Sequence, residues 1–165
     1  MNRRTALKAS LGTTLALALV QQVGAQTMDA NSQASFDTVM AFMDAMGKGE
    51  REQMSSLMAD DMVWHNEGDQ TLPWIGETRG KEEIFKFLEV FSSNLKTTLW
   101  ETPAAFAVVD PVAVFGTMNG ITTKSGNETG VFTFALRAKV RNGKIVLWNW
   151  FEDSFAMSQA YHGRS

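Results

Sequence analysis

The sequence predicts an α+β fold in which helices come first and an antiparallel sheet follows. Apolar residues recur at helical spacing in most of the stretch from Phe36 to Leu95, whereas from Thr97 onward apolar and polar residues alternate as they do in strands. The dipeptide Asn142-Gly143 is a strong signal for a two-residue hairpin turn. Helices gathered ahead of antiparallel strands are typical of a sheet that packs one face against helices.

Two helices are expected first. The first follows a flexible, polar lead-in at residues 26–35, with Ser32 or Ser35 as its N-terminal cap. The second covers residues 50–58 and is expected to end before the acidic pair at 60–61. Both carry methionine and other apolar side chains on one face, which predicts that they pack against a sheet.

A first strand, residues 62–66, precedes the third helix, and a loop at residues 67–78 is expected between them. Gly80 opens that helix, and the acidic residues of its first turn suit the helix dipole. Four further strands and a short final helix complete the predicted order, at residues 97–106, 112–121, 129–140, 144–151 and 154–161.

The composition excludes several classes of protein. The chain has 165 residues, 20% charged and 44% hydrophobic, which fits one globular domain. It has no cysteine and two histidines, so we expect no disulfide, no metal site and no cofactor. Its net charge is −3, and it becomes −6 without residues 1–25, which carry three bases and no acid. A chain of that sign has no broad attraction to nucleic acid or to an anionic membrane.

Residues 1–25 have the composition of an export signal. A basic start with Arg3, Arg4 and Lys8 precedes a mildly apolar run that ends at Val20. That run is about ten residues long, about half of what a membrane-spanning helix needs. The segment is therefore predicted to direct export and not to anchor the chain.

Cleavage of the signal peptide is expected before Gln26, because Val23 and Ala25 stand at the positions that signal peptidase reads. The paired arginines resemble a twin-arginine signal. Ala6 stands where that motif usually has Phe, so the general secretory route is the alternative. Either route predicts a periplasmic or secreted protein, with no membrane association after cleavage.

Four segments carry a family resemblance: FMDAM at 42–46, ADDMVWH at 59–65, GETRGKEEI at 76–84 and NGKIVLW at 142–148. With the element order, they resemble the nuclear transport factor 2-like superfamily and its SnoaL-like branch of polyketide cyclases and ketosteroid isomerase-like proteins. The resemblance spans residues 36–161. It implies a cone-shaped roll, in which three N-terminal helices pack on a curled, mainly antiparallel sheet around one deep pocket. Such a fold hosts many functions, so it does not decide among them.

The resemblance and the strand period together indicate the pocket walls. Trp64 and Asn66 are two residues apart and share a face, which by similarity to the epoxide hydrolases of the family looks into the pocket. The charged catalytic groups of those hydrolases fall on neutral residues here, so their mechanism is not expected. An aromatic pocket of this kind suits a small hydrophobic or aromatic molecule. The predicted ligand-binding residues are Trp64, Asn66, Thr117, Asn119, Trp148 and Trp150.

His65 and Glu67 are the candidate catalytic residues, expected at the mouth of the pocket. A histidine exchanges protons near neutral pH, and a carboxylate in an aromatic cavity has a raised pKa. The resemblance implies an aspartate base at the end of this strand in steroid isomerases, and the nearest residues here are Asn66 and Glu67.

Two functions stay open on the sequence. The first is a small enzyme of isomerase, cyclase or dehydratase type that works by acid–base chemistry without a cofactor. The second is a non-catalytic periplasmic module for ligand binding or assembly. A homodimer through the open face of the sheet is expected with either, because the late strands carry more aromatic residues than one small cone can hold.

Overall fold

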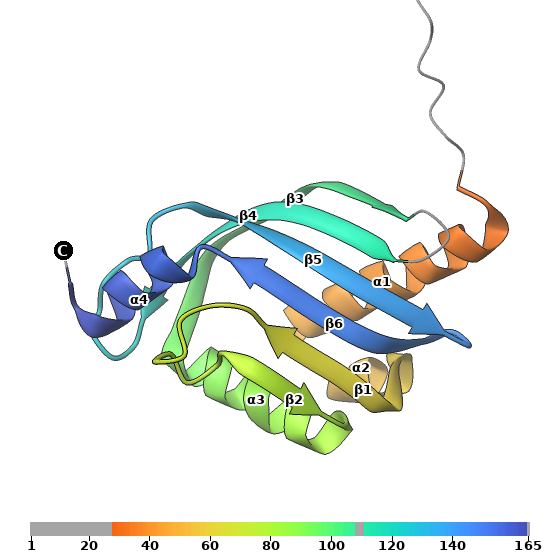
Figure 1. The fold of residues 1–165 in the computed structure, drawn as a ribbon, viewed down its shortest axis with the longest axis horizontal. Helices are drawn as coiled ribbons and strands as arrows, with labels where there is room; N and C mark the ends of the chain where they lie inside the picture. Colours follow the sequence, from red (N-terminus) through yellow and green to blue (C-terminus); the bar gives the residue numbers. More distant parts are fainter. Residues whose placement is uncertain (1–27, 108–110, 165) are drawn as a thin grey trace, which may run out of the picture.

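The computed structural model describes residues 28–107 and 111–164, which form helices and one sheet (Figure 1). The signal predicted at residues 1–25 lies outside this part of the chain. The elements in chain order are α1 (Ala30–Lys48), α2 (Arg51–Leu57), β1 (Met58–Asn66), β2 (Gly76–Arg79), α3 (Lys81–Asn94), β3 (Leu95–Ala107), β4 (Val112–Thr122), β5 (Phe132–Arg141), β6 (Lys144–Glu152) and α4 (Ser154–His162).

The six strands form one sheet in the order β2-β1-β6-β5-β4-β3. Strands β3 to β6 make an antiparallel meander, and β1 joins it parallel to β6. The hairpin between β5 and β6 turns at Asn142 and Gly143, which have φ of 52° and 70° as such a turn requires. The predicted α+β class with a mainly antiparallel sheet is confirmed.

Helices α1 and α3 cover one face of the sheet (Figure 1). α1 contacts the four strands of the meander, and α3 contacts β1, β2 and β3. The apolar stripe of α1 includes Val39 and Phe42, both fully buried between helix and sheet. The structure has a fourth helix, α4, which follows the last strand; Asp153 caps it by accepting a hydrogen bond from the Ala156 N–H at 3.1 Å.

The first helix begins earlier than the apolar pattern predicts. α1 starts at Ala30, inside the stretch expected as a flexible lead-in. Its cap is Asp29, whose carboxylate accepts hydrogen bonds at 2.9 Å from the N–H groups of Asn31 and Ser32. The predicted caps Ser32 and Ser35 both lie within the helix. The predicted start is too late because the first turn of α1 is polar and shows no apolar period.

The acidic pair Asp60-Asp61 does not end a helix. Both residues lie in β1, which begins at Met58 directly after α2. Asp60 pairs with Lys81 at 2.9 Å, and Asp61 receives two hydrogen bonds from the Arg141 guanidinium. A strand tolerates these carboxylates because both are exposed and each meets a cation from a neighbouring element.

The loop expected at residues 67–78 contains the start of a short strand. β2 pairs antiparallel with the end of β1, so that Asn66 lies opposite Gly76 and Trp64 opposite Thr78. Across residues 28–107 and 111–164, no helix is long and apolar enough to cross a membrane.

Candidate functional site

Three tryptophans and an asparagine meet on the face of the sheet that the helices cover. Trp64 of β1 lies opposite Trp148 of β6, and Asn66 lies opposite Trp150. The Trp64 and Trp148 rings stack with centroids 5.2 Å apart. All four side chains are buried. The predicted convergence of these two residue pairs is therefore found.

A cavity of about 50 Å³ lies among these side chains. Its lining comes from α1, α3 and the three strands β1, β3 and β6, and none of the lining side chains carries a charge. The lining residues are Met46, Trp64, Asn66, Phe87, Leu88, Phe91, Trp100, Trp148 and Trp150. An apolar, uncharged lining favours a neutral guest.

Two of the polar groups in this lining differ in how they are bonded. The Trp64 indole donates to the Asn66 carbonyl oxygen Oδ1 at 2.7 Å. The Trp148 ring is 0% exposed, and its Nε1–H has no acceptor among the described residues. A buried donor without an acceptor costs about 1–3 kcal/mol, so a guest atom that accepted from this N–H would be favoured.

A larger groove adjoins the cavity between the helices and β3. Its volume is about 700 Å³, within the range of small-molecule sites. Four side chains line both spaces: Met46, Leu88, Phe91 and Trp100. Arg51 also lines the groove, where it pairs with Glu89 at 3.3 Å and lies 4.0 Å from the centre of the Phe85 ring.

The expected convergence of Thr117 and Asn119 with the tryptophans is wrong. Their neighbours Gly116 and Met118 face the helices and are buried, so the strand period turns Thr117 and Asn119 to the opposite face. Thr117 donates to Glu101 at 3.4 Å, and Asn119 accepts from Thr129 at 3.1 Å. Neither residue lines the cavity.

The candidate catalytic residues His65 and Glu67 also lie away from the cavity. His65 stands between Trp64 and Asn66 in β1, so its side chain belongs to the outer face. Its Nδ1 lies 3.6 Å from the Glu67 carboxylate, and both side chains are partly exposed. Neither residue is part of the cavity lining.

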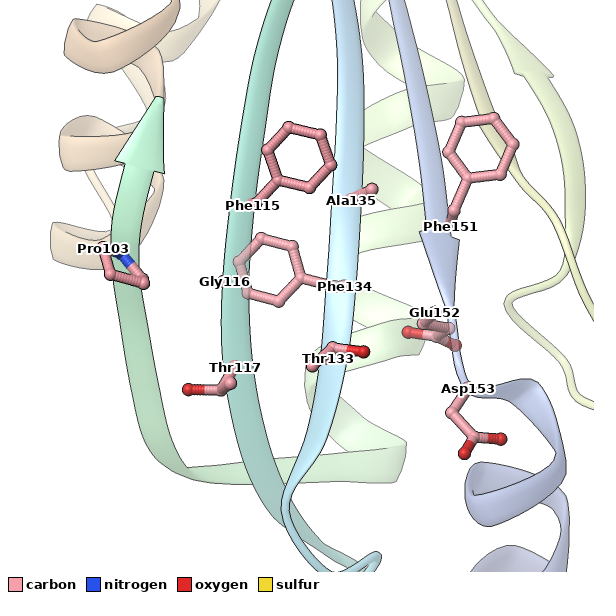
Figure 2. Close-up of a pocket in the computed structure, with 10 residues that line it drawn as sticks. All are labelled: Pro103, Phe115, Gly116, Thr117, Thr133, Phe134, Ala135, Phe151, Glu152 and Asp153. Carbon is pink, nitrogen blue, oxygen red and sulfur yellow. The ribbon is translucent and has the colours of Figure 1, made fainter. Parts of the chain in front are cut away.

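The outer face of the sheet carries a depression of about 540 Å³, shown in Figure 2. Phe115, Ala135 and Phe151 lie opposite one another on three neighbouring strands, and Thr117 lies opposite Thr133. Phe115 and Phe151 are 45% and 40% exposed. This face is thus apolar and open over its centre.

Glu152 is a residue of interest that the sequence reasoning missed. Its carboxylate accepts hydrogen bonds from two indoles, Trp150 at 2.9 Å and Trp74 at 3.4 Å. Burial raises the pKa of Glu152, against the lowering effect of these two bonds. The signal in the sequence is its place two residues after Trp150, which puts both side chains on the same face.

The described residues offer no obvious place for a metal ion. Within 28–107 and 111–164, no three His, Asp or Glu side chains gather in a way that suits one. The cavity itself is lined by indole, phenyl, thioether and amide groups, which hold an organic ring better than a cation.

Comparison with solved structures finds the same fold in several proteins. An NTF2-like protein from Burkholderia xenovorans LB400 is 23% identical, with a TM-score of 0.73 over 79% of this chain and 97% of that one. A protein from Jannaschia sp. CCS1 assigned to the SnoaL-like polyketide cyclases is 17% identical, with a TM-score of 0.69 over 85% and 99%. An LEH-like epoxide hydrolase from M. tuberculosis is 18% identical, with a TM-score of 0.61 over 80% and 92%.

Comparison with curated proteins gives no match. The family model for the SnoaL-like domain matches residues 39–148, from the middle of α1 to the stacked Trp148 of β6. This match covers α2, α3, the strands β1 to β5 and most of the cavity lining described above, and the chain belongs to the SnoaL-like family.

Proposed function

We propose that this SnoaL-like protein binds a small, neutral, planar organic molecule that carries a hydrogen-bond acceptor such as a carbonyl oxygen. The observation that carries the proposal is the buried Trp148 indole, which lines the cavity and lacks an acceptor. The stacked Trp64 and Trp148 rings support a planar guest, because flat surfaces pack well on one another.

The available space supports a ligand that reaches into the cavity from the groove. A cavity of about 50 Å³ is too small for a two- or three-ring molecule. The adjoining groove of about 700 Å³ has room for one. Trp100, which is 40% exposed and lines both spaces, would lie beside the ligand as it enters.

Acid–base catalysis without a cofactor is the second candidate function. His65 and Glu67 would carry it, but their position outside the cavity favours binding without catalysis at this site. Glu152 is the residue that supports this second function, because its carboxylate accepts a hydrogen bond from a tryptophan of the cavity wall and its pKa is raised.

A matched pair of probes tests the binding proposal. We expect 9-fluorenone to bind more tightly than fluorene by roughly tenfold, because only the ketone offers Trp148 an acceptor. Trp148→Phe should remove this preference and keep fluorene binding. Quenching of tryptophan fluorescence measures both affinities. Asn119→Leu, on the outer face, is the control and should keep the preference. Equal affinities for the two probes in the unaltered protein would refute the proposal.

We also propose that the chain is exported to the periplasm or the medium, by the twin-arginine route. The support is the sequence of residues 1–25 alone. Cleavage is expected before Gln26, and N-terminal sequencing of the exported protein checks it. Replacing both Arg3 and Arg4 by Lys should block export, and unchanged export would instead indicate the general secretory route.

We further propose that the protein forms a homodimer through the outer face of the sheet. Phe106, Phe115 and Phe151 are each at least 40% exposed on this face, and Phe106 stacks on Phe115 at 6.0 Å. Burial of these rings in a partner would stabilise an assembly. Light scattering should give twice the chain mass at micromolar concentration, and Phe115→Lys should give the monomer. A monomeric unaltered protein would contradict this prediction.

A further inference from the structure

We propose that Glu152 is a positioning residue for the ligand cavity: its ionised carboxylate holds Trp150 and Trp74 in place, and ligand binding depends on that charge. This inference rests on the proposed function and deepens it. It concerns a side chain that does not line the cavity itself and acts through two rings.

The first step is the geometry of the carboxylate. Trp150 Nε1 donates to Glu152 Oε2 at 2.9 Å, and Trp74 Nε1 donates to Oε1 at 3.4 Å. Trp150 belongs to β6, whereas Trp74 belongs to the loop between β1 and β2. The carboxylate therefore joins the sheet to a loop that is distant in sequence.

The second step is the packing of these two rings against the residues that line the cavity. Trp150 lines the cavity and packs on Phe134 at 4.4 Å and on Trp100 at 5.7 Å between ring centroids. Trp74 is almost fully buried and packs edge-on against Phe91, another cavity residue, at 5.8 Å. Glu152 thus supports two separate walls of the cavity, one directly bonded and one through a ring contact.

The third step is the charge of Glu152. An ionised carboxylate offers a full acceptor oxygen to each indole, whereas a protonated carboxyl keeps only one good acceptor. Protonation would therefore release one of the two rings. Because burial raises the pKa of Glu152, this release would begin at higher pH than for an exposed glutamate.

Other titratable groups surround the same cluster, and their titration must be distinguished from that of Glu152. The negative charge of Asp153 adds to the rise in the pKa of Glu152. Asp69, in the loop that carries Trp74, has its pKa lowered to about 2 by hydrogen bonds from Ser158 and Thr71, so it stays ionised. On α4, Tyr161 packs on Trp74, and His162 bonds Thr71.

The test follows the indole N–H signals of the full chain by NMR while the pH is lowered from about 7.5 to about 4. We expect the Trp150 and Trp74 signals to shift together, with one midpoint higher than the ordinary pKa of an exposed glutamate. Glu152→Gln should abolish this titration, and His162→Gln should retain it. Glu82→Gln, which changes an exposed glutamate of α3, is the matched control and should also retain it.

Binding of 9-fluorenone is measured on the same proteins. In the unaltered protein the affinity should fall roughly tenfold over this pH range, and Glu152→Gln should bind roughly tenfold more weakly at neutral pH with no pH response. By reciprocity, bound 9-fluorenone should lower the midpoint of the indole titration.

The two proposals fail in different ways. If the indole signals titrate but the protein binds no probe, the contacts of the Glu152 carboxylate are supported and the proposal of ligand binding is refuted. Probe binding that is independent of pH and unchanged in Glu152→Gln would refute the positioning role, whatever its effect on the melting temperature. Indole signals of Trp150 and Trp74 that ignore Glu152→Gln would refute it as well.

Discussion

Phe42→Ala is expected to lower the free energy of unfolding by about 3–5 kcal/mol. Phe42 is 0% exposed on α1, and its ring lies 4.9 Å from Trp148 and 6.4 Å from Trp64. Truncation would leave a void between α1 and the centre of the sheet, which rigid indole rings cannot fill. The whole stability of a domain is about 5–15 kcal/mol, so much of it would be lost.

Urea unfolding followed by circular dichroism measures this loss. Phe155→Ala is the matched control, because the same ring is deleted from a side chain that is 72% exposed on α4. Its effect should stay within about 0.5 kcal/mol. A loss of less than about 1 kcal/mol for Phe42→Ala would mean that α1 does not pack on the sheet as described.

Gly116→Ala is expected to destabilise the protein by about 1–3 kcal/mol or more, although it adds a single methyl group. Gly116 lies in β4, where a Cβ atom would collide with the Glu101 carbonyl oxygen of β3 and with the Phe134 ring. On the β3 side the added Cβ atom would meet a backbone carbonyl, which cannot move aside without shifting the strand. Movement of Phe134 on the other side would disturb Trp150 and Trp100, on which it packs.

The matched control is Gly47→Ala, near the end of α1, where a Cβ atom would meet nothing within 4 Å. Alanine in a helix is more stable than glycine by about 0.5–1 kcal/mol, so this variant should be slightly stabilised. The two variants therefore shift the melting temperature in opposite directions. Equal shifts would contradict the close approach of β3 and Phe134 to Gly116.

The order of the helices and of the five longer strands is predictable from the sequence, whereas the short strand β2 lies in a stretch expected as a loop. The alternation in residues 112–121 and 144–151 recurs in β4 and β6, and the turn at Asn142-Gly143 joins the predicted strands. Local physics decides these features, because strand period and left-handed turn residues act over only a few positions. The cap at Asp29 was not predictable from apolar spacing, since polar residues fill the first turn of α1.

Local pattern predicts which residues of β1 and of β6 share a face, and the family resemblance predicts that this face looks inward. Trp64 with Asn66, and Trp148 with Trp150, share a face by parity, and the structure brings the two pairs together. Thr117 and Asn119 also share a face, but parity within one strand does not say which face it is. The pairing of β4 with β3 and β5, with Gly116 and Met118 inward, turns them away from the cavity.

The sequence by itself determined the class of the fold, the family, and which residues of β1 and β6 share a face, because each of these depends on local period or on motifs of neighbouring residues. Tertiary structure alone decided which polar groups meet them. The Trp148 indole is left without an acceptor by what surrounds it, and Glu152 reaches Trp74 across 78 positions of the chain. Hydrogen bonds between such distant residues depend on the register and packing of whole elements, which no local pattern specifies.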